Sequence, residues 1–266
     1  MRNMNDDSGA VVRLDIALVE RGVTDSRSKA QRLIESGKVR VNGIVASKAS
    51  LKVTAADTLD ADLGDDYVSR GAYKLVGAFD MFSQTGLRSA EGFDCLDIGA
   101  STGGFCDVLL RRGAAHVIAL DVGHGQLHPS LRENSRVTAL EGVNARTMTP
   151  GLFPVPPDMA VMDVSFISQS LIYPALAVLR PGSRLVTLVK PQFEAGRAHI
   201  GKGGLVKPSD RLYGDIFAKL ENAAAENGLA LLAQMPSPVR GGDGNAEFLA
   251  LFARVEGGTD EGKDRN

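Results

Sequence analysis

The sequence predicts an α/β protein whose larger part is a doubly wound, mostly parallel sheet, preceded by a small α+β unit. Two observations predict this sheet. Five short apolar segments alternate with helical or loop segments between residues 95 and 190, among them a predicted helix at 167–179, and two more apolar segments follow between 229 and 252. Such alternation is typical of βα units, and the last two segments complete a seven-stranded sheet. A third observation predicts the separate small unit, because an acidic, glycine-containing stretch at 62–66 divides two differently patterned regions.

Length and composition limit the alternatives. The 266 residues suffice for one large domain or two smaller ones, and 44% apolar with 23% charged residues is typical of an ordinary folded core. The net charge of −2 means that any affinity for nucleic acid must come from local clusters of charge. Two cysteines without metal-ligand spacing, and no apolar run of about 18 residues, predict a cytoplasmic protein with neither a metal site nor a membrane span.

The region before residue 67 has its own pattern. We predict a disordered tail at 1–10, a folded unit at 11–61, a linker at 62–66, the large domain at 67–256 and a second tail at 257–266. Within 11–61 the pattern predicts helices at 13–20 and 27–36, then a hairpin with its turn at Asn42-Gly43, and a strand at 58–61.

Basic residues are concentrated in this small unit. Residues 11–60 contain nine Lys/Arg and six Asp/Glu, and on charge alone a solvated face is as good an interpretation as an RNA-binding surface. The segments Arg13-Leu-Asp, Ser26-Arg-Ser-Lys-Ala-Gln-Arg-Leu-Ile and Gly37-Lys-Val-Arg-Val-Asn-Gly together resemble the S4 RNA-binding domain. The resemblance implies contacts to RNA phosphates, which set affinity and register more than sequence choice. The residues concerned are Arg13, Arg27, Lys29, Arg32 and Lys38.

A glycine-rich turn follows the first strand of the large domain. The apolar run 95–98 ends at Gly99, and two more glycines at 103 and 104 precede a helical stretch. This strand–turn–helix layout directs backbone N–H groups at a ligand, although Ser101 replaces a glycine of the usual dinucleotide motif. The second strand ends at Asp121, where a carboxylate can accept hydrogen bonds from ribose hydroxyls. The pattern predicts an adenosine-type cofactor other than NAD; the alternative is a turn that serves only helix–strand packing.

Four charged residues fall at or beside the ends of predicted elements that the sheet would bring together. They are Lys74, Asp163, Lys190 and Glu247. A lysine that ends an apolar strand needs a partner, because a buried ammonium group is costly alone. One interpretation is a buried ion pair between strand ends. The other is alkyl transfer to a hydroxyl group, with a lysine as the general base.

The order and context of these four residues resemble the K-D-K-E tetrad of the FtsJ/RrmJ-like 2′-O-ribose methyltransferases, and the segment 96–105 resembles their S-adenosylmethionine loop. The S4 unit and this catalytic domain together resemble the TlyA (hemolysin A) rRNA methyltransferase family, from about residue 12 to 255. Three further segments carry that resemblance: Ser69-Arg-Gly-Ala-Tyr-Lys74, Asp163-Val-Ser-Phe-Ile-Ser168 and Val189-Lys-Pro-Gln-Phe-Glu194. Tyr73 is a local departure, since we expect histidine there.

The resemblance implies a Rossmann-like class I methyltransferase that uses S-adenosylmethionine to methylate the 2′-hydroxyl of cytidines in ribosomal RNA, of the 16S or 23S type or both. Lys190 would be the base, Asp163 would orient it, and Lys74 and Glu247 would position the ribose. The implied cofactor-binding residues are Asp97, Gly99, Ala100, Ser101, Gly103, Gly104, Phe105, Asp121 and Asn144. Arg70, Arg197 and Lys202 are further candidates for RNA contact, although the last two also fit a solvated loop.

Three alternative functions fit the sequence less well than rRNA methylation. A non-catalytic ribosome-assembly factor would need no tetrad, and a membrane-active hemolysin would need an amphipathic or apolar membrane segment, which the sequence lacks. Base methylation would use an Asn/Asp-Pro-Pro-aromatic motif, which Asp163-Val-Ser-Phe is not. We expect ribosomal RNA or ribosomal subunits as partners, and a monomer or weak dimer.

Overall fold

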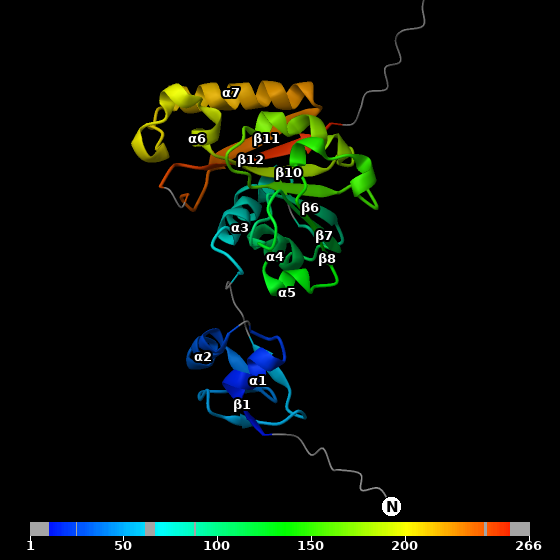
Figure 1. The fold of residues 1–266 in the computed structure, drawn as a ribbon, viewed down its shortest axis with the longest axis vertical. Helices are drawn as coiled ribbons and strands as arrows, with labels where there is room; N and C mark the ends of the chain where they lie inside the picture. The colour runs from blue at the N-terminus through cyan, green and yellow to red at the C-terminus, as the bar shows by residue number, and fades with distance from the viewer. Residues whose placement is uncertain (1–10, 25, 62–66, 88, 242–243, 256–266) are drawn as a thin grey trace, which may run out of the picture. The chain divides into compact units, whose positions relative to one another are not determined.

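The computed structural model describes residues 11–24, 26–61, 67–87, 89–241 and 244–255. These residues form two compact units, which divide between positions 66 and 67 (Figure 1). The predicted tails at 1–10 and 257–266 and the predicted linker at 62–66 lie outside the described residues.

The small unit contains two helices and short strands. Ser26 begins the second helix, because its side chain accepts a hydrogen bond from the backbone N–H of Lys29. Asn42 and Gly43 both have positive φ (51° and 80°), which is the backbone of the two-residue hairpin turn that this dipeptide predicts. The elements are β1 (Val12–Arg13), α1 (Leu14–Glu20), α2 (Arg27–Glu35), β2 (Val39–Val41), β3 (Ile44–Val45), β4 (Lys52–Val53) and β5 (Leu59–Ala61). The sheet order is β3-β2-β5, and β1 pairs with β4.

The described part of the large unit contains a seven-stranded sheet of order β11-β12-β10-β9-β6-β7-β8. Five strands are parallel to their neighbours within the sheet, while β12 pairs antiparallel with both β10 and β11. This confirms the predicted Rossmann-like, mostly parallel sheet with a small α+β unit before it. The strands are β6 (Asp94–Ile98), β7 (His116–Asp121), β8 (Val137–Glu141), β9 (Met159–Met162), β10 (Arg184–Val189), β11 (Leu229–Pro236) and β12 (Phe248–Arg254).

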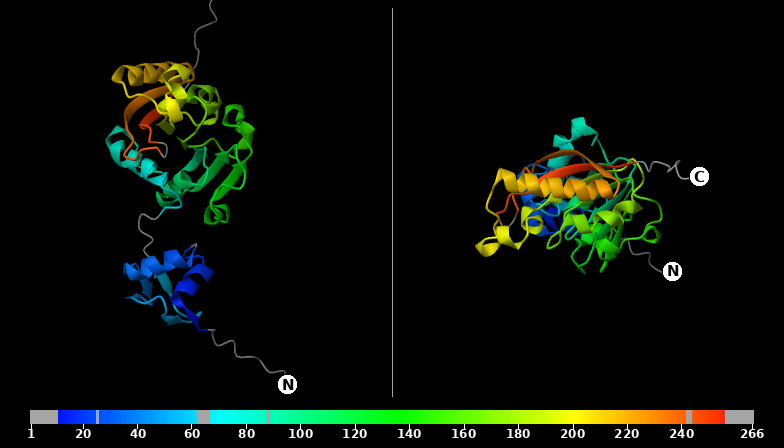
Figure 2. Two further views of the ribbon diagram at one scale, coloured as in Figure 1. Left: turned by 60° about the vertical axis from the view of Figure 1, so that its left-hand side comes forward. Right: turned by 90° about the horizontal axis from the view of Figure 1, so that it is seen from above.

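Helices cover both faces of this sheet (Figures 1 and 2). On one face α3 (Ala72–Met81) and α4 (Gly104–Arg111) pack through residues such as Leu75, Phe79 and Leu109. On the other face lie α7 (Asp210–Glu226) and two 3₁₀ segments, η4 (Gln169–Leu171) and η5 (Tyr173–Val178). The strands between these layers are apolar on both sides, as a doubly covered sheet requires.

The remaining short elements lie in the connections. They are η1 (Ser83–Thr85), α5 (Pro129–Arg132), η2 (Ala145–Thr147), η3 (Pro150–Leu152), α6 (Pro191–Glu194), η6 (Arg197–His199) and η7 (Lys202–Gly204). The sequence predicts one α-helix over 167–179, and this prediction is wrong. Pro174 lacks a backbone N–H and its ring obstructs a continuing α-helix, so the segment forms two 3₁₀ pieces instead.

The chain crosses from one side of the sheet to the other at its centre. Strand β6 lies between β7, the next strand in sequence, and β9, the third strand after β6. Ligands of open α/β sheets bind at the carboxyl ends of the strands beside such a reversal. In this sheet the carboxyl ends of β6, β9 and β10 therefore define where the functional site should lie.

Candidate active site

The glycine turn after β6 leaves no room for side chains. A Cβ on Gly99, whose φ is +82°, would lie 2.5 Å from the carbonyl oxygen of Asp163. A Cβ on Gly104 would meet the hydroxyl of Ser69 and approach the backbone N of Ala72 to 3.0 Å. The turn therefore needs glycine both for its backbone and for close contact with neighbouring segments.

Asp97 lies at the base of this turn and is completely buried. Its Oδ2 accepts a hydrogen bond from the Cys106 thiol at 3.0 Å, while Oδ1 has no partner among the described residues. Burial raises the pKa of Asp97 to about 7; the Cys106 hydrogen bond lowers that pKa, and the charge of Asp163 raises it again. Asp97 also lines a cavity of about 220 Å³ together with Gly99, Gly104 and other residues of the turn. A buried carboxylate oxygen without a donor, at the wall of a cavity, fits a cationic ligand group.

Asp121 ends β7, as the sequence predicts, and its carboxylate closes the turn. Oδ2 accepts from the backbone N of Ser101 at 2.8 Å, and Oδ1 accepts from that of Gly123 at 2.8 Å. Asn144 caps η2 by accepting from the backbone N of Arg146 at 3.0 Å. Asp121 and Asn144 line a second cavity of about 460 Å³, whose walls are mainly apolar. The residue types and their places agree with the predicted site for a ribose and an adenine ring, which stays a prediction.

The four predicted catalytic residues form two ion pairs. Lys190 Nζ lies 2.5 Å from Asp163 Oδ1, and Lys74 Nζ lies 2.6 Å from Glu247 Oε2. Asp163 follows β9 and Lys190 follows β10, two neighbouring parallel strands. Lys74 comes from α3, and Glu247 directly precedes β12. Sequence-distant elements thus bring the tetrad to one edge of the sheet.

A third cavity, of about 580 Å³, joins three members of this tetrad. It is lined by Lys74, Lys190 and Glu247, with Phe166, Phe193 and the glycine-rich segment around 203–204. Lys190 also lines the 220 Å³ cavity beside the glycine turn, and Asp163 lines both that cavity and the 460 Å³ cavity. The Lys190–Asp163 pair therefore stands between a cavity suited to a cofactor and one open to a second ligand.

Two residues beside the tetrad were not singled out from the sequence. Ser165 Oγ lies 2.9 Å from Lys190 Nζ and lines all three cavities. Phe166 is 92% exposed, has a positive φ of 65°, and packs against Phe193 with ring centroids 5.2 Å apart. A left-handed backbone at such a residue costs about 1–3 kcal/mol and concentrates at functional sites. The sequence around it, Val164-Ser-Phe-Ile167, gives no sign of this backbone or of this exposure.

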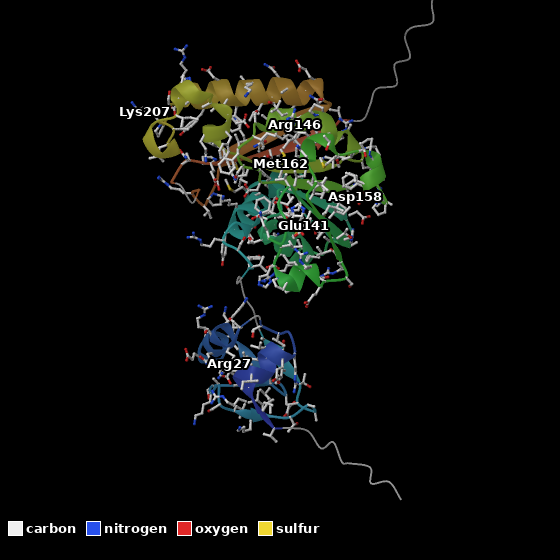
Figure 3. All side chains as sticks on the ribbon, viewed as in Figure 1. Arg27, Glu141, Arg146, Asp158, Met162 and Lys207 are labelled. Carbon is white, nitrogen blue, oxygen red and sulfur yellow. The ribbon has the colours of Figure 1, made fainter. Side chains whose placement is uncertain are left out.

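In the small unit, two predicted RNA contacts also have an internal partner. Arg13 Nε and Arg27 Nη2 each lie 2.9 Å from the buried carboxylate of Asp15, and Gln31 donates to it at 2.8 Å. The hydrogen bond from Arg13 is the main cause that holds the pKa of Asp15 well below its usual range. Arg27 lies on the first turn of α2 (Figure 3) and remains half exposed. Asp15 thus anchors both arginines while leaving part of each accessible to RNA.

The other predicted RNA contacts are placed as follows. Lys29, Arg32 and Lys38 lie on or just after α2 and are exposed or half-buried, and Arg70 is exposed just before α3. Arg197 and Lys202 lie in the η6–η7 segment, whose bridge between Ile200 and Val206 makes it a short loop. The side chains of Arg197 and Lys202 lie outside the described part of the structure. These roles remain predictions.

The described residues contain neither a metal-binding group nor a membrane-spanning helix. No three His, Cys, Asp or Glu side chains in this part of the chain group as ligands for a metal ion. Among the described helices, none has both the length and the apolar character needed to cross a membrane.

Comparison with known proteins gives consistent relationships. Residues 67–254 match the FtsJ-like methyltransferase family and residues 12–59 match the S4 domain. The chain is 44% identical over 247 residues to the 16S/23S rRNA (cytidine-2′-O)-methyltransferase TlyA of Mycobacterium tuberculosis, which covers 92% of this chain and 90% of that one. It is 42% identical to Hemolysin A of Brachyspira hyodysenteriae, over 91% of this chain and 99% of the relative. A solved structure described as a hemolysin, from Streptococcus thermophilus, has 39% identity and a TM-score of 0.68, covering 92% of this chain and 89% of that chain.

The fold, the glycine turn and these matches define a Rossmann-like methyltransferase carrying an S4 domain. The chain belongs to the FtsJ-like methyltransferase family, in the group of the TlyA relatives. The family resemblance predicted from the sequence motifs is thereby confirmed.

Proposed function

We propose that this enzyme transfers a methyl group from S-adenosylmethionine to the 2′-hydroxyl of cytidines in ribosomal RNA. One observation carries the proposal. The Lys190–Asp163 pair stands between the cavities of the glycine turn and the cavity lined by Lys74 and Glu247. The name of the Mycobacterium tuberculosis relative gives the same substrate.

The cavities beside β6 and β7 fit S-adenosylmethionine. Asp97 offers an unpaired, buried oxygen for the ammonium group of the methionine part, and Gly99 and Gly104 leave space that a Cβ would fill. Asp121 can accept from the ribose hydroxyls, and the apolar 460 Å³ cavity suits adenine beside Asn144. When bound, this cofactor supplies an electrophilic methyl group on a sulfonium centre.

The tetrad handles the proton and the position of the ribose. Once Lys190 has given its ammonium proton to solvent, its Nζ accepts the proton of the 2′-hydroxyl as the hydroxyl oxygen forms its bond to the methyl carbon. The bond between that methyl carbon and the sulfur breaks in the same step and would leave the sulfur as a neutral thioether. Asp163 and Ser165 hold Nζ in place from one side. Lys74 and Glu247 lie across the cavity, where they can bond the neighbouring ribose oxygens. Catalysis then depends mainly on alignment, because the sulfonium provides the reactivity.

The exposed ring of Phe166 provides a surface for the target base. Phe166 lines the same cavity as Lys190, and its ring packs against the ring of Phe193. A base stacked on an aromatic side chain must leave its own stack, and such stacking is the usual way in which proteins hold single-stranded or extruded bases. The small unit then supplies contacts to RNA phosphates through its basic residues.

The direct test is methyl transfer from radiolabelled S-adenosylmethionine to ribosomal RNA or ribosomal subunits, with the product mapped by 2′-O-specific resistance to alkaline cleavage. We expect Lys190→Ala to lower transfer by at least about 100-fold, as loss of a general base does, while RNA binding and cofactor binding persist. Arg211→Ala, which removes an exposed cation of α7 in the large unit, is the matched control. Transfer that survives in Lys190→Ala would refute the role of this lysine.

The assay also separates this proposal from its rivals. A ribosome-assembly factor without catalysis would bind RNA but transfer no methyl group in the wild-type form. Base methylation would incorporate label without protection from alkali. A membrane-active protein would release a dye from lipid vesicles in the absence of RNA.

A further inference from the structure

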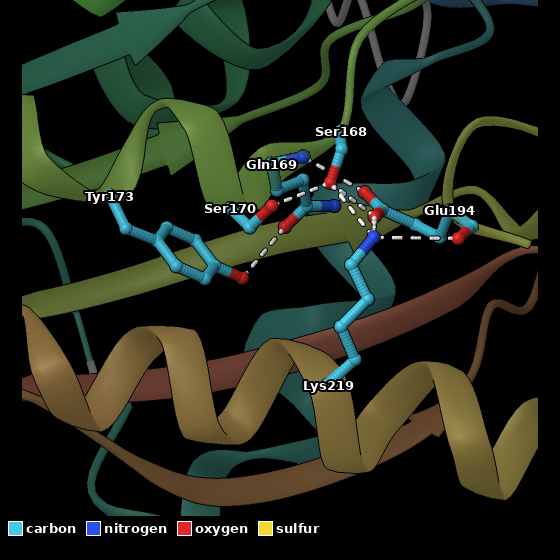
Figure 4. A network of polar contacts seen from close by, with 6 residues as sticks. All are labelled: Ser168, Gln169, Ser170, Tyr173, Glu194 and Lys219. Carbon is cyan, nitrogen blue, oxygen red and sulfur yellow. Dashed lines mark hydrogen bonds and ion pairs between the residues drawn. The ribbon is translucent and has the colours of Figure 1, made fainter. Parts of the chain in front are cut away.

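A network of polar side chains, three of them buried, lies on the α7 side of the sheet (Figure 4). Figure 4 shows its members on three parts of the chain: the segment after β9, the end of α6, and α7. Two of them, Gln169 and Glu194, are almost fully buried, with 2% and 6% of their surface exposed. Neither belongs to the tetrad or to the predicted cofactor site, so their burial needs another explanation.

The side chain of Gln169 is bonded to strand β10. Its Nε2 donates to the carbonyl oxygen of Leu188 at 2.7 Å. Its Oε1 accepts from the hydroxyl of Thr187 at 2.7 Å and from that of Tyr173 at 3.3 Å. Thr187 and Leu188 lie on β10, which ends just before Lys190. Gln169 therefore fixes its own segment to the strand that leads into the proposed base.

Glu194 fixes the same segment from the other side of Lys190. Its Oε1 accepts from the backbone N of Gln169 at 2.9 Å, and its Oε2 accepts from the hydroxyl of Ser168 at 2.6 Å. Lys219 of α7 places its Nζ 3.5 Å from Oε2. Glu194 ends α6, four residues after Lys190. The segment 168–169 is therefore bonded to residues on both sides of Lys190 in the sequence: to β10 before it and to Glu194 after it.

These bonds close a loop that reaches Lys190 directly. At its start, the backbone N of Asp163 donates to the carbonyl oxygen of Ile98 at 3.0 Å. At its end, Ser168 and Gln169 are held by Glu194. Between these anchors the loop presents the Asp163 carboxylate and the Ser165 hydroxyl to Lys190 Nζ, at 2.5 and 2.9 Å. It also holds Phe166 at a positive φ, a backbone state that persists only when the surroundings fix it.

A polar network serves this purpose better than apolar packing would. Hydrogen bonds are directional, and a buried carboxylate tolerates few arrangements other than the one that satisfies it. We propose that Gln169 and Glu194 are positioning residues, which hold the Asp163–Ser165 loop against the end of β10 so that Lys190 Nζ keeps its orientation. This inference rests on the proposed function, in which Lys190 takes part in methyl transfer.

The first test compares three variants in methyl transfer at saturating RNA and S-adenosylmethionine. We expect Glu194→Ala to lower kcat by about 10- to 100-fold, because small errors in position have effects of that size. The KM for RNA and the Kd for S-adenosylmethionine should stay within about twofold, as these residues touch neither ligand in the proposal. Glu194→Gln, whose amide oxygen can still accept from the N–H of residue 169, should recover most of the loss. Glu221→Ala, which removes an exposed carboxylate of α7 outside the network, is the matched control and should keep wild-type kcat.

The second test reports on Lys190 without any reaction. In protein labelled with ¹³C-lysine, the Cε–Hε signal of Lys190 is assigned by its loss in Lys190→Arg. We expect this signal to move in Glu194→Ala and to stay in place in Glu221→Ala. If Glu194→Ala does not fold, Thr187→Val takes its place, since it removes one donor to Gln169 with little change of shape. It should give the same shift and a smaller loss of kcat.

The outcomes are separable. The positioning role would be overturned if the variant that folds kept both the wild-type Lys190 signal and the wild-type kcat. Here kcat is calculated per mole of protein that binds cofactor. A wild-type enzyme that transfers no methyl group, but whose Lys190 signal moves in Glu194→Ala, would overturn the proposed function and leave the structural link intact.

Discussion

Replacing Asp97 by asparagine should stabilise the large unit, and by more at pH 8 than at pH 5. The reason is the environment of its carboxyl group, which is fully buried and accepts hydrogen bonds from the thiol and the backbone of Cys106. Burial disfavours the charged form, so the pKa of Asp97 rises to about 7 in the folded protein. An asparagine keeps an oxygen for the thiol and never ionises.

The size of the effect follows from the two pKa values of this group. In the unfolded chain an aspartate has a pKa of about 3.9, so between roughly pH 4 and pH 7 the folded state of the wild type binds more protons than the unfolded state does. The free energy of unfolding therefore falls as pH rises through that window. From pH 5 to pH 8 the loss attributable to Asp97 amounts to about 2–3 kcal/mol. The Asp97→Asn variant should lack this part of the pH dependence.

The protein offers a selective probe for this measurement. It has no tryptophan, and all four of its tyrosines lie at residue 67 or later, so tyrosine fluorescence follows only the large unit. Urea unfolding at pH 5 and pH 8 gives the difference between wild type and variant at each pH, which cancels the contribution of unchanged groups. Cys106→Ala, which removes the thiol donor, should steepen the pH dependence of the wild-type carboxylate. Parallel pH dependence in wild type and Asp97→Asn would refute the reasoning.

Three further predictions concern stability and function together. Gly104→Ala should lower the free energy of unfolding by about 1–3 kcal/mol in urea and weaken cofactor binding in calorimetry, because its Cβ meets Ser69, whereas Gly151→Ala has open space and should do neither. Phe166→Gly and Phe166→Ala should reduce methyl transfer alike, but the glycine variant should be more stable by about 1 kcal/mol, since φ is +65°; equal stability would contradict the backbone assignment. Asp15→Asn should destabilise the small unit by about 2 kcal/mol at pH 7, seen as faster amide exchange in its helices. Because the pKa of Asp15 is lowered in the fold, that difference should shrink as the pH falls below about 4, and a difference that persists in acid would count against the ion pairs.

The sequence predicts most of the fold because each signal is local. The apolar runs that end at Ile98, Asp121 and Val189 lie in strands that are covered on both faces, so their pattern is short and continuous. The Asn42-Gly43 turn is equally local. The α-helix predicted for 167–179 does not form, because its apolar spacing suits a helix while Pro174 prevents a continuous one.

The site was predictable where a residue type is costly without a partner. Lys190 at the end of an apolar strand needs a counter-charge, and the fold supplies Asp163 from the next strand. Phe166 could not be found in this way, because an exposed phenylalanine with a left-handed backbone follows from the path of its loop, which the local sequence does not reveal. The same holds for Asp15, a buried acid within a stretch that otherwise reads as an amphipathic helix.

The two ion pairs of the tetrad have a consequence for how salt acts on the enzyme. Before the reaction, with both lysines protonated, each faces one carboxylate, so the four charges cancel and the reaction cavity offers little net attraction to a polyanion. Counterion release on RNA binding must then arise at phosphate contacts elsewhere, such as the arginines and lysines of the small unit. Added salt should weaken the capture of RNA steeply while leaving the rate of the bound complex almost constant, which makes recruitment and chemistry separately adjustable by ionic strength.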